Sequence, residues 1–196
     1  MKYTKLGKSD LTVSRICMGC MGFGDAKNGQ HSWTLDEENS RRIIRRGLEL
    51  GVNFFDTAIG YQGGTSEQYL GRALKDFAKR QDVVVATKFL LRTAAEIEAG
   101  VSGQEHIQRS VDTSLKNLGM DYVDLYIYHM WDYETPLYDI MDGLNRIAKA
   151  VELSLSPEET AYLEEAYVPH RLVGVMAQNT PEASGQPHVW FSGKSR

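Results

Sequence analysis

Apolar and polar positions follow a repeating order along the first 150 residues of the chain. Short runs rich in Val, Ile and Phe alternate with longer segments in which apolar residues recur every three or four positions. The first pattern is typical of strands buried on both faces, and the second is typical of amphipathic helices. The order predicts strands at residues 15–19, 52–58, 82–89 and 123–130, each followed by a helix, between Thr34 and Gly51 and at residues 65–79, 102–119 and 136–150.

The first helix carries signals at both of its ends. Thr34 is expected as its N-cap, with Glu37 three residues later at the spacing of a capping box, and Gly51 is expected to end it. Its inner face is expected to consist of Ile43, Ile44, Gly47 and Leu48. Before the first strand, alternation on both sides of residues 7–10 predicts a short β-hairpin.

Strands of this kind, separated by helices, indicate an α/β protein with a parallel sheet built from four βα units. An ionisable residue stands at the carboxyl end of the second, third and fourth strands, namely Asp56, Lys88 and His129. In parallel α/β barrels the βα loops gather at that end and form the active site. Because an ionisable residue recurs at the same point of three consecutive units, a shared functional site is favoured over three unrelated polar residues at strand ends.

Together with Tyr61 in the loop after the second strand, these residues can carry a defined chemistry. A phenol holds its proton at neutral pH, and a nearby ammonium such as that of Lys88 is expected to lower its pKa and make it a useful general acid. Asp56 can hold Lys88 charged and oriented, and His129 can donate a hydrogen bond to a carbonyl oxygen. The set suits protonation of a carbonyl oxygen while hydride reaches its carbon.

No side chain is a hydride donor, so this chemistry needs a nicotinamide cofactor. The run "GCMGFG" from Gly19 has the order G-x-x-G-x-G and is not followed directly by a helix, which argues against a Rossmann domain. A barrel-type cofactor site remains open.

The chain resembles the aldo-keto reductases, in their microbial and potassium-channel β-subunit-like branch. The resemblance rests on "SRICMGCMGFG", "GVNFFDTAIGY" followed by "SEQYLGRAL", "VVVATKF", "SLKNLGMDYVDLYIYHMWD" and "TPLYDIMDGLN", and it covers about residues 1–150. It implies a TIM barrel that binds NADP(H) in an extended form and reduces a small aldehyde or ketone to an alcohol. The family's catalytic tetrad corresponds to Asp56 (orienting Lys88), Tyr61 (proton donor), Lys88 (lowering the pKa of Tyr61) and His129 (orienting the carbonyl).

The same resemblance implies further contacts. Cys20 and Met21, together with Asp56, are expected to bind the cofactor near its nicotinamide and ribose. Trp33 and Trp131 are expected to line the substrate pocket.

A complete barrel of this type has about 250 residues and eight βα units, whereas four units are recognisable here. After Ala150 the sequence resembles the C-terminus of the family, so the join to Val151 indicates an internal deletion or an incompletely assembled sequence. Residues 1–168 are expected to form a TIM-barrel-type half-barrel with a C-terminal helix. Residues 169–196 are expected to be a disordered tail.

Such a half-barrel would have two open strand edges with apolar inner faces. A homodimer whose twofold axis follows the barrel axis would pair the fourth strand of one chain with the first strand of the other and close the barrel. Aggregation is the competing outcome.

The amino-acid composition indicates the class of protein and excludes some kinds of partner. The 196 residues are 42% hydrophobic and 24% charged, as in an ordinary globular domain, and the net charge of −4 gives no electrostatic reason to expect nucleic acid. No stretch reaches the roughly 18 apolar residues of a membrane span, so a cytoplasmic location is expected. Cys17 and Cys20 are three apart on a strand and face opposite sides, which predicts reduced packing thiols and no shared metal.

Two functions therefore remain open on the sequence. The first is an NADPH-dependent reductase that uses the tetrad. The second is a non-catalytic relative, a half-barrel that serves as a binding module or an inactive remnant. A serine or cysteine hydrolase is disfavoured because the G-x-S-x-G motif is absent.

Overall fold

The computed structural model describes residues 1–131 and 135–149, which belong to two compact units. The described part of the first unit consists of residues 1–91 and 107–131, and that of the second consists of residues 92–106 and 135–149.

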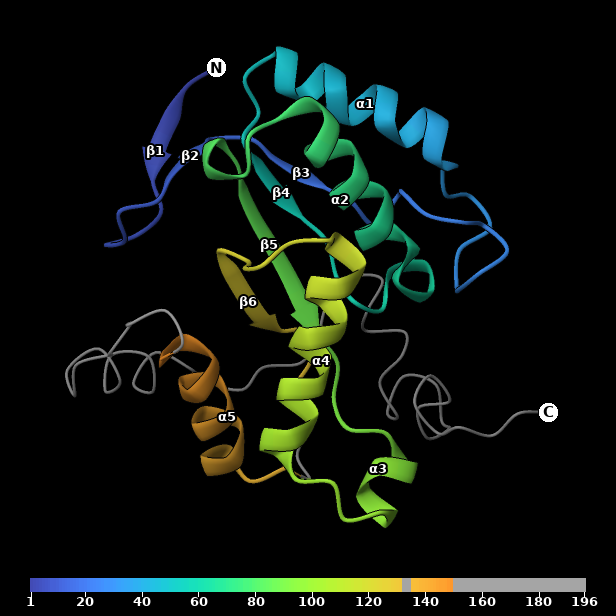
Figure 1. The fold of residues 1–196 in the computed structure, drawn as a ribbon, viewed down its shortest axis with the longest axis vertical. Helices are drawn as coiled ribbons and strands as arrows, with labels where there is room; N and C mark the ends of the chain where they lie inside the picture. Colours follow the sequence, from blue (N-terminus) through green and yellow to red (C-terminus); the bar gives the residue numbers. More distant parts are fainter. Residues whose placement is uncertain (132–134, 150–196) are drawn as a thin grey trace, which may run out of the picture. The chain divides into compact units, whose positions relative to one another are not determined.

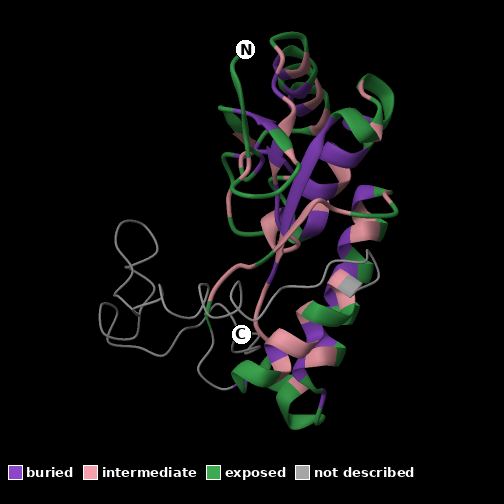
Figure 2. Cartoon of the chain, turned by 90° about the vertical axis from the view of Figure 1, so that its left-hand side faces the viewer, coloured by how far each residue is buried: buried purple, intermediate pink, exposed green. Residues whose placement is uncertain are grey.

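A four-stranded parallel sheet forms the centre of the first unit (Figure 1). Its strands follow the chain order: β3 (Cys17–Gly19), β4 (Phe54–Asp56), β5 (Val84–Phe89) and β6 (Leu125–Tyr128). The longest strand, β5, is buried along nearly its whole length (Figure 2). Strands β1 (Tyr3–Lys5) and β2 (Thr12–Ser14) form a separate antiparallel hairpin. The predicted hairpin, the parallel sheet and the order of the four βα units are confirmed.

Helices cover one face of this sheet. They are α1 (Glu37–Glu49), α2 (Thr65–Phe77) and α4 (Gly103–Leu118), the last of which starts in the second unit and continues into the first. Phe55 and Val85 from the strands, Ile44 from α1 and Leu70 from α2 are fully buried in one apolar cluster. Burial of an apolar side chain of this size contributes roughly 1.5–3 kcal/mol, so this cluster is a main source of stability for the unit.

The pleat of the strands places the polar residues on the other face. Successive side chains of a strand point to opposite sides of the sheet. Because Phe55 and Val85 face the helices, their neighbours at even-numbered positions, including Asp56 and Lys88, face away from the apolar cluster.

The start of α1 differs from the sequence prediction. Its N-cap is Asp36, whose side chain accepts a hydrogen bond from the Asn39 backbone N–H at 2.9 Å, so the expected cap at Thr34 is wrong. Leu35 forms a β-bridge with Phe23, and the chain therefore stays extended beyond Thr34. The expected inner position of Ile43 is also wrong, because that residue is 42% exposed.

Two short 3-10 turns complete the first unit, Tyr61–Gly64 and Arg80–Asp82. Both cysteines are free: Cys20 is buried as expected for a packing thiol, whereas Cys17 is exposed, which corrects the prediction for that residue.

The second unit contains the short helix α3 (Ala94–Glu98) and helix α5 (Leu137–Lys149). Helix α5 was expected from the sequence, and α3 was not, because five residues are too few to show a helical period. A capping box between Thr93 and Glu96 starts α3.

Other sequence predictions fall outside the described residues. They concern the join at residues 150 and 151, the C-terminal helix and the tail at residues 169–196. Within residues 1–131 and 135–149, the helices are too short or too polar for any of them to cross a membrane.

Candidate active site

Three ionisable side chains lie at the ends of neighbouring strands. Asp56 is the last residue of β4, Lys88 is the penultimate residue of β5, and His129 directly follows β6. The strands are parallel and in register, with Lys88 opposite Ile127, and the His129 N–H donates to the Phe89 carbonyl oxygen at 3.0 Å. The structure thus brings the three groups to the same end of the sheet, as the sequence predicts.

The ammonium of Lys88 is the centre of this group. It donates hydrogen bonds to the carboxylate of Asp56, to the carbonyl oxygen of Thr57 at 2.8 Å and to the hydroxyl of Tyr61 at 3.2 Å. The side chain of Lys88 is only 12% exposed. An ammonium has three N–H donors, and three acceptors surround this one, so its position is well determined.

Tyr61 reaches the site from the tight turn after β4. Its backbone N–H donates to the Ala58 carbonyl oxygen at 3.1 Å, and the turn continues to Gly64. Its ring meets the ring of His129 edge-on, with 5.6 Å between the ring centroids. The phenol therefore contacts both the ammonium of Lys88 and the imidazole of His129.

His129 is the electrically neutral member of the group. Burial of the imidazole, together with the positive charge of Lys88, lowers the pKa of His129 to about 4, and the charge of Asp56 opposes part of this shift. At neutral pH the ring therefore has one N–H donor and one acceptor nitrogen. Its buried Nδ1 has no hydrogen-bond partner among the described residues. A hydrogen-bonding position is thus left for a ligand beside Tyr61.

These contacts suit proton transfer to an oxygen atom. A phenol that donates its proton leaves a negative oxygen, and an ammonium 3.2 Å away stabilises that charge. The carboxylate of Asp56 balances the charge of the ammonium, and the neutral imidazole can orient the acceptor by a hydrogen bond.

The residues expected to contact a cofactor differ in their exposure. Met21 is 41% exposed, and the carboxylate-bearing side chain of Asp56 is 29% exposed, so both can contact a bound molecule. Cys20 has no exposed surface, because its side chain points into the apolar cluster. Its backbone groups are also engaged, since its N–H donates to the Asp56 carbonyl and its carbonyl accepts from Ser66. The contact of Cys20 with a cofactor stays a prediction, and it would need part of this residue to become accessible.

The two tryptophans expected in the substrate pocket are both accessible. Trp33 is 56% exposed and stacks on His31, with 4.8 Å between the ring centroids. Trp131 is 42% exposed and meets Tyr128 edge-on. Their contact with a substrate stays a prediction.

Two buried polar residues near the site were not found from the sequence. Gln62, next to Tyr61, is 1% exposed, and Glu67 is fully buried. The Glu67 carboxylate accepts from the Thr87 hydroxyl at 2.6 Å and from the Asn117 amide at 2.9 Å, which joins α2 to β5 and α4 directly beside Lys88. A glutamine in a turn and a glutamate in the first turn of a helix resemble surface residues, so no sequence signal identified them.

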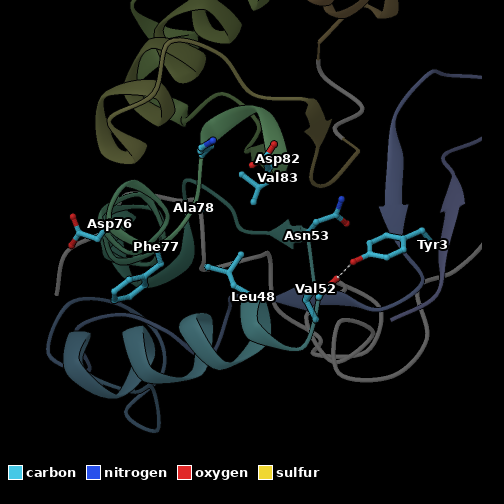
Figure 3. A pocket seen from close by; sticks show the side chains of 11 residues that line it. Tyr3, Leu48, Val52, Asn53, Asp76, Phe77, Ala78, Asp82 and Val83 are labelled. Carbon is cyan, nitrogen blue, oxygen red and sulfur yellow. Dashed lines mark hydrogen bonds between the residues drawn. The ribbon is translucent and has the colours of Figure 1, made fainter.

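A pocket of the first unit lies away from this group of residues. Its volume is about 510 Å³. It is bordered by Val52 and Asn53, which precede β4, and by Val83, which precedes β5 (Figure 3). It is therefore at the amino ends of the strands, where barrels of this kind place stability and not catalysis. The Tyr3 hydroxyl donates to the Gly51 carbonyl oxygen there at 2.8 Å and ties the hairpin to the end of α1.

Known proteins resemble this chain in sequence and in structure. A family model described as the aldo/keto reductase family matches residues 15–178. Versiconal hemiacetal acetate reductase of Aspergillus parasiticus is 35% identical in an alignment 169 residues long, which covers 76% of this chain and 48% of that protein. A probable voltage-gated potassium channel subunit beta of Oryza sativa subsp. japonica is 35% identical over 147 residues, which are 74% of this chain and 42% of that protein.

A solved structure gives the same result. The holo form of an aldo-keto reductase from Bacillus halodurans is 36% identical, with a TM-score of 0.62 over 76% of this chain and 47% of that one. The chain thus spans less than half the length of these relatives, and its sheet corresponds to part of their TIM barrel. Because the family model, the similar relatives and the fold all agree, the chain belongs to the aldo/keto reductase family.

Proposed function

We propose that this protein reduces an aldehyde or ketone to an alcohol and uses NADPH as the reductant. The observation that supports this most strongly is the position of Lys88, which hydrogen-bonds both to Asp56 and to the Tyr61 hydroxyl. That arrangement places a proton donor beside a fixed positive charge at the carboxyl end of a parallel sheet. Membership of a family of carbonyl reductases supports the same reaction.

The proton step is assigned to Tyr61. Its hydroxyl gives a proton to the carbonyl oxygen, and the Lys88 ammonium stabilises the phenolate that remains. Asp56 keeps the ammonium in place, and His129 donates a hydrogen bond that orients the carbonyl. The carbonyl carbon gains a hydride and the oxygen gains a proton, which together give the alcohol.

The reductant follows from the chemistry of the site and from the family. A bound nicotinamide dinucleotide supplies the hydride, which no side chain can do. The unpartnered Nδ1 of His129 and the partly exposed Asp56 and Met21 fit a ligand at this end of the sheet. We assign the nicotinamide and ribose to Met21 and Asp56, and the choice of NADPH over NADH rests on resemblance to the family.

A titration with NADPH tests this proposal. The protein has three tryptophans, whose fluorescence should be quenched with saturation at micromolar NADPH. The Tyr61→Phe variant should bind NADPH equally well and lose reductase activity by a factor of about 100 or more, because it lacks the hydroxyl group that gives the proton. A Tyr69→Phe variant, altered on α2, serves as the control and should retain activity.

A second candidate is a binding module without turnover. It is favoured by the similarity to a protein named as a probable potassium channel subunit beta. It is also favoured because the chain spans only 42% of that protein. NADPH binding with no reduction across a panel of aldehydes and ketones would support this candidate, and absence of binding up to millimolar NADPH would remove the reductase proposal.

A further inference from the structure

Gln62, beside the catalytic group, is a buried polar residue with an unusual backbone conformation. It directly follows Tyr61, its side chain is 1% exposed, and its backbone has φ 48° and ψ 48°. It is the one residue other than glycine with positive φ in the described part of the chain. Such a conformation is unfavourable for a residue with a side chain, and it persists only where the surroundings determine it strongly.

The side chain of Gln62 is hydrogen-bonded to one loop, residues 24–34, which is part of the connection between β3 and α1. The side-chain oxygen of Gln62 accepts from the backbone N–H groups of Gln30 at 3.1 Å and His31 at 3.0 Å. The side-chain nitrogen donates to the carbonyl oxygens of Asp25 at 3.0 Å and His31 at 2.8 Å, and to the Thr34 hydroxyl at 3.2 Å. One buried amide therefore satisfies backbone groups along most of the loop.

The loop is also shaped to fit around this residue. Gly24 and Gly29 have φ of +136° and +138°, and a Cβ on either would lie 2.6 Å from an atom of Gln62. Thr65 adds a second link, because its hydroxyl donates to the Gln62 carbonyl at 2.7 Å and accepts from the Asp25 N–H at 2.9 Å. The glycines permit an approach that side chains would prevent.

Both segments joined by Gln62 belong to the candidate site. The turn holds the Tyr61 hydroxyl against Lys88. The loop leaves the carboxyl end of β3 and carries Trp33, which is 56% exposed and stacked on His31. We propose that Gln62 is a positioning residue that fixes the loop at residues 24–34 to the Tyr61 turn and thereby sets the affinity for the carbonyl substrate. This inference rests on the proposed reductase function.

Hydrogen exchange of the purified protein tests the structural part. In Gln62→Met, which keeps the length of the side chain and loses its polar atoms, the amides of Gln30 and His31 should exchange at least about tenfold faster. A peptide from β5 should exchange at its wild-type rate. Gln68→Met, the same change on α2 outside the loop contacts, is the matched control and should leave the loop unchanged.

A second variant approaches the contact from the loop. Gly29→Ala leaves Gln62 intact and places a Cβ against its backbone, so it should release the same amides. Gly7→Ala is its control, because Gly7 also has positive φ but a Cβ there has no neighbour within 4 Å. This pair keeps the test decisive if Gln62→Met does not fold.

Steady-state kinetics test the functional part. The KM for the carbonyl should rise about tenfold in Gln62→Met, while the dissociation constant of NADPH should change less than about twofold. Unchanged exchange at Gln30 and His31, or an unchanged KM, would overturn the inference. If the wild-type protein neither binds NADPH nor reduces carbonyls, the reductase proposal fails, and the exchange comparison still decides whether Gln62 holds the loop.

Discussion

His129 and Lys88 lie in one small group but differ in charge. The ammonium of Lys88 has the carboxylate of Asp56 as its counter-ion, whereas the imidazole of His129 has no counter-ion of its own in the described contacts. Burial and the neighbouring positive charge keep the imidazole neutral. A neutral imidazole suits the proposed role, because it can orient a carbonyl without adding a second cation beside Lys88.

This difference predicts a pH dependence of stability. The pKa of His129 is about 4 in the folded protein and near 6.5 in an unfolded chain. Between these values the unfolded chain binds more protons, so the contribution of His129 to stability is present above pH 6.5 and is lost as the pH falls toward 4. The urea midpoint of the wild-type protein should therefore fall more between pH 7 and pH 4.5 than that of His129→Gln. Equal decreases in the two proteins would contradict the assigned pKa.

Helices α2 and α4 meet at a glycine. A Cβ on Gly71 would lie 2.0 Å from the carbonyl oxygen of Leu118, at the end of α4. That oxygen belongs to the backbone and cannot move without displacing the end of the helix. The close contact holds α2 against α4 beside the buried Glu67, which bonds Thr87 in β5 and Asn117 in α4.

The glycine contact gives a prediction for Gly71→Ala. Alanine favours a helix by about 1 kcal/mol relative to glycine, but overpacking that shifts the backbone costs roughly 1–3 kcal/mol and occasionally more. We expect a net loss in the free energy of unfolding, measured by urea denaturation. Gly19→Ala is the control, because a Cβ there meets no atom within 4 Å. A variant as stable as the wild type would show that α2 and α4 separate readily.

Helix boundaries show the limits of local signals. Thr34 and Glu37 have the spacing of a capping box, yet Asp36 caps α1 because the bridge between Leu35 and Phe23 keeps the chain extended. The observed bounds of α2 and α4 agree better with those predicted from the sequence. Gly64 directly precedes α2 and Gly119 directly follows α4, and both have positive φ.

In the first unit, strands β3 and β6 are the outer strands of the described sheet, each with one hydrogen-bonded neighbour. We propose, from the sequence and this topology, that two chains associate so that β6 of one pairs with β3 of the other. Association of that kind preserves the parallel direction of the strands.

Light scattering coupled to size exclusion tests the association. The proposed dimer should have twice the 22.1-kDa mass of the chain at micromolar concentration. The substitution Ile127→Pro, in β6, should shift the protein to monomers. Proline has no backbone N–H, so the paired edge loses a hydrogen-bond donor. A monodisperse monomer of the wild-type chain would exclude this dimer.

The amino-acid sequence is enough to predict the order of the strands and helices and the residues at the strand ends. Apolar runs and the helical period of 3.6 residues are local patterns, so they assign Asp56, Lys88 and His129 to one rim without any tertiary contact. Tyr61 was added to the group from its place in the loop after the second strand and from the acidity of its phenol, and the resemblance to a family implies the same four residues.

Which of these groups touch, and what surrounds them, follows from the tertiary structure. The three hydrogen bonds of Lys88, the complete burial of Cys20 and the contacts of Gln62 with residues 24–34 all join segments distant in the sequence. Such contacts depend on the path of the whole chain and on the packing of the apolar cluster. A pattern along the chain has no information about either, because each position contributes only its own polarity and spacing.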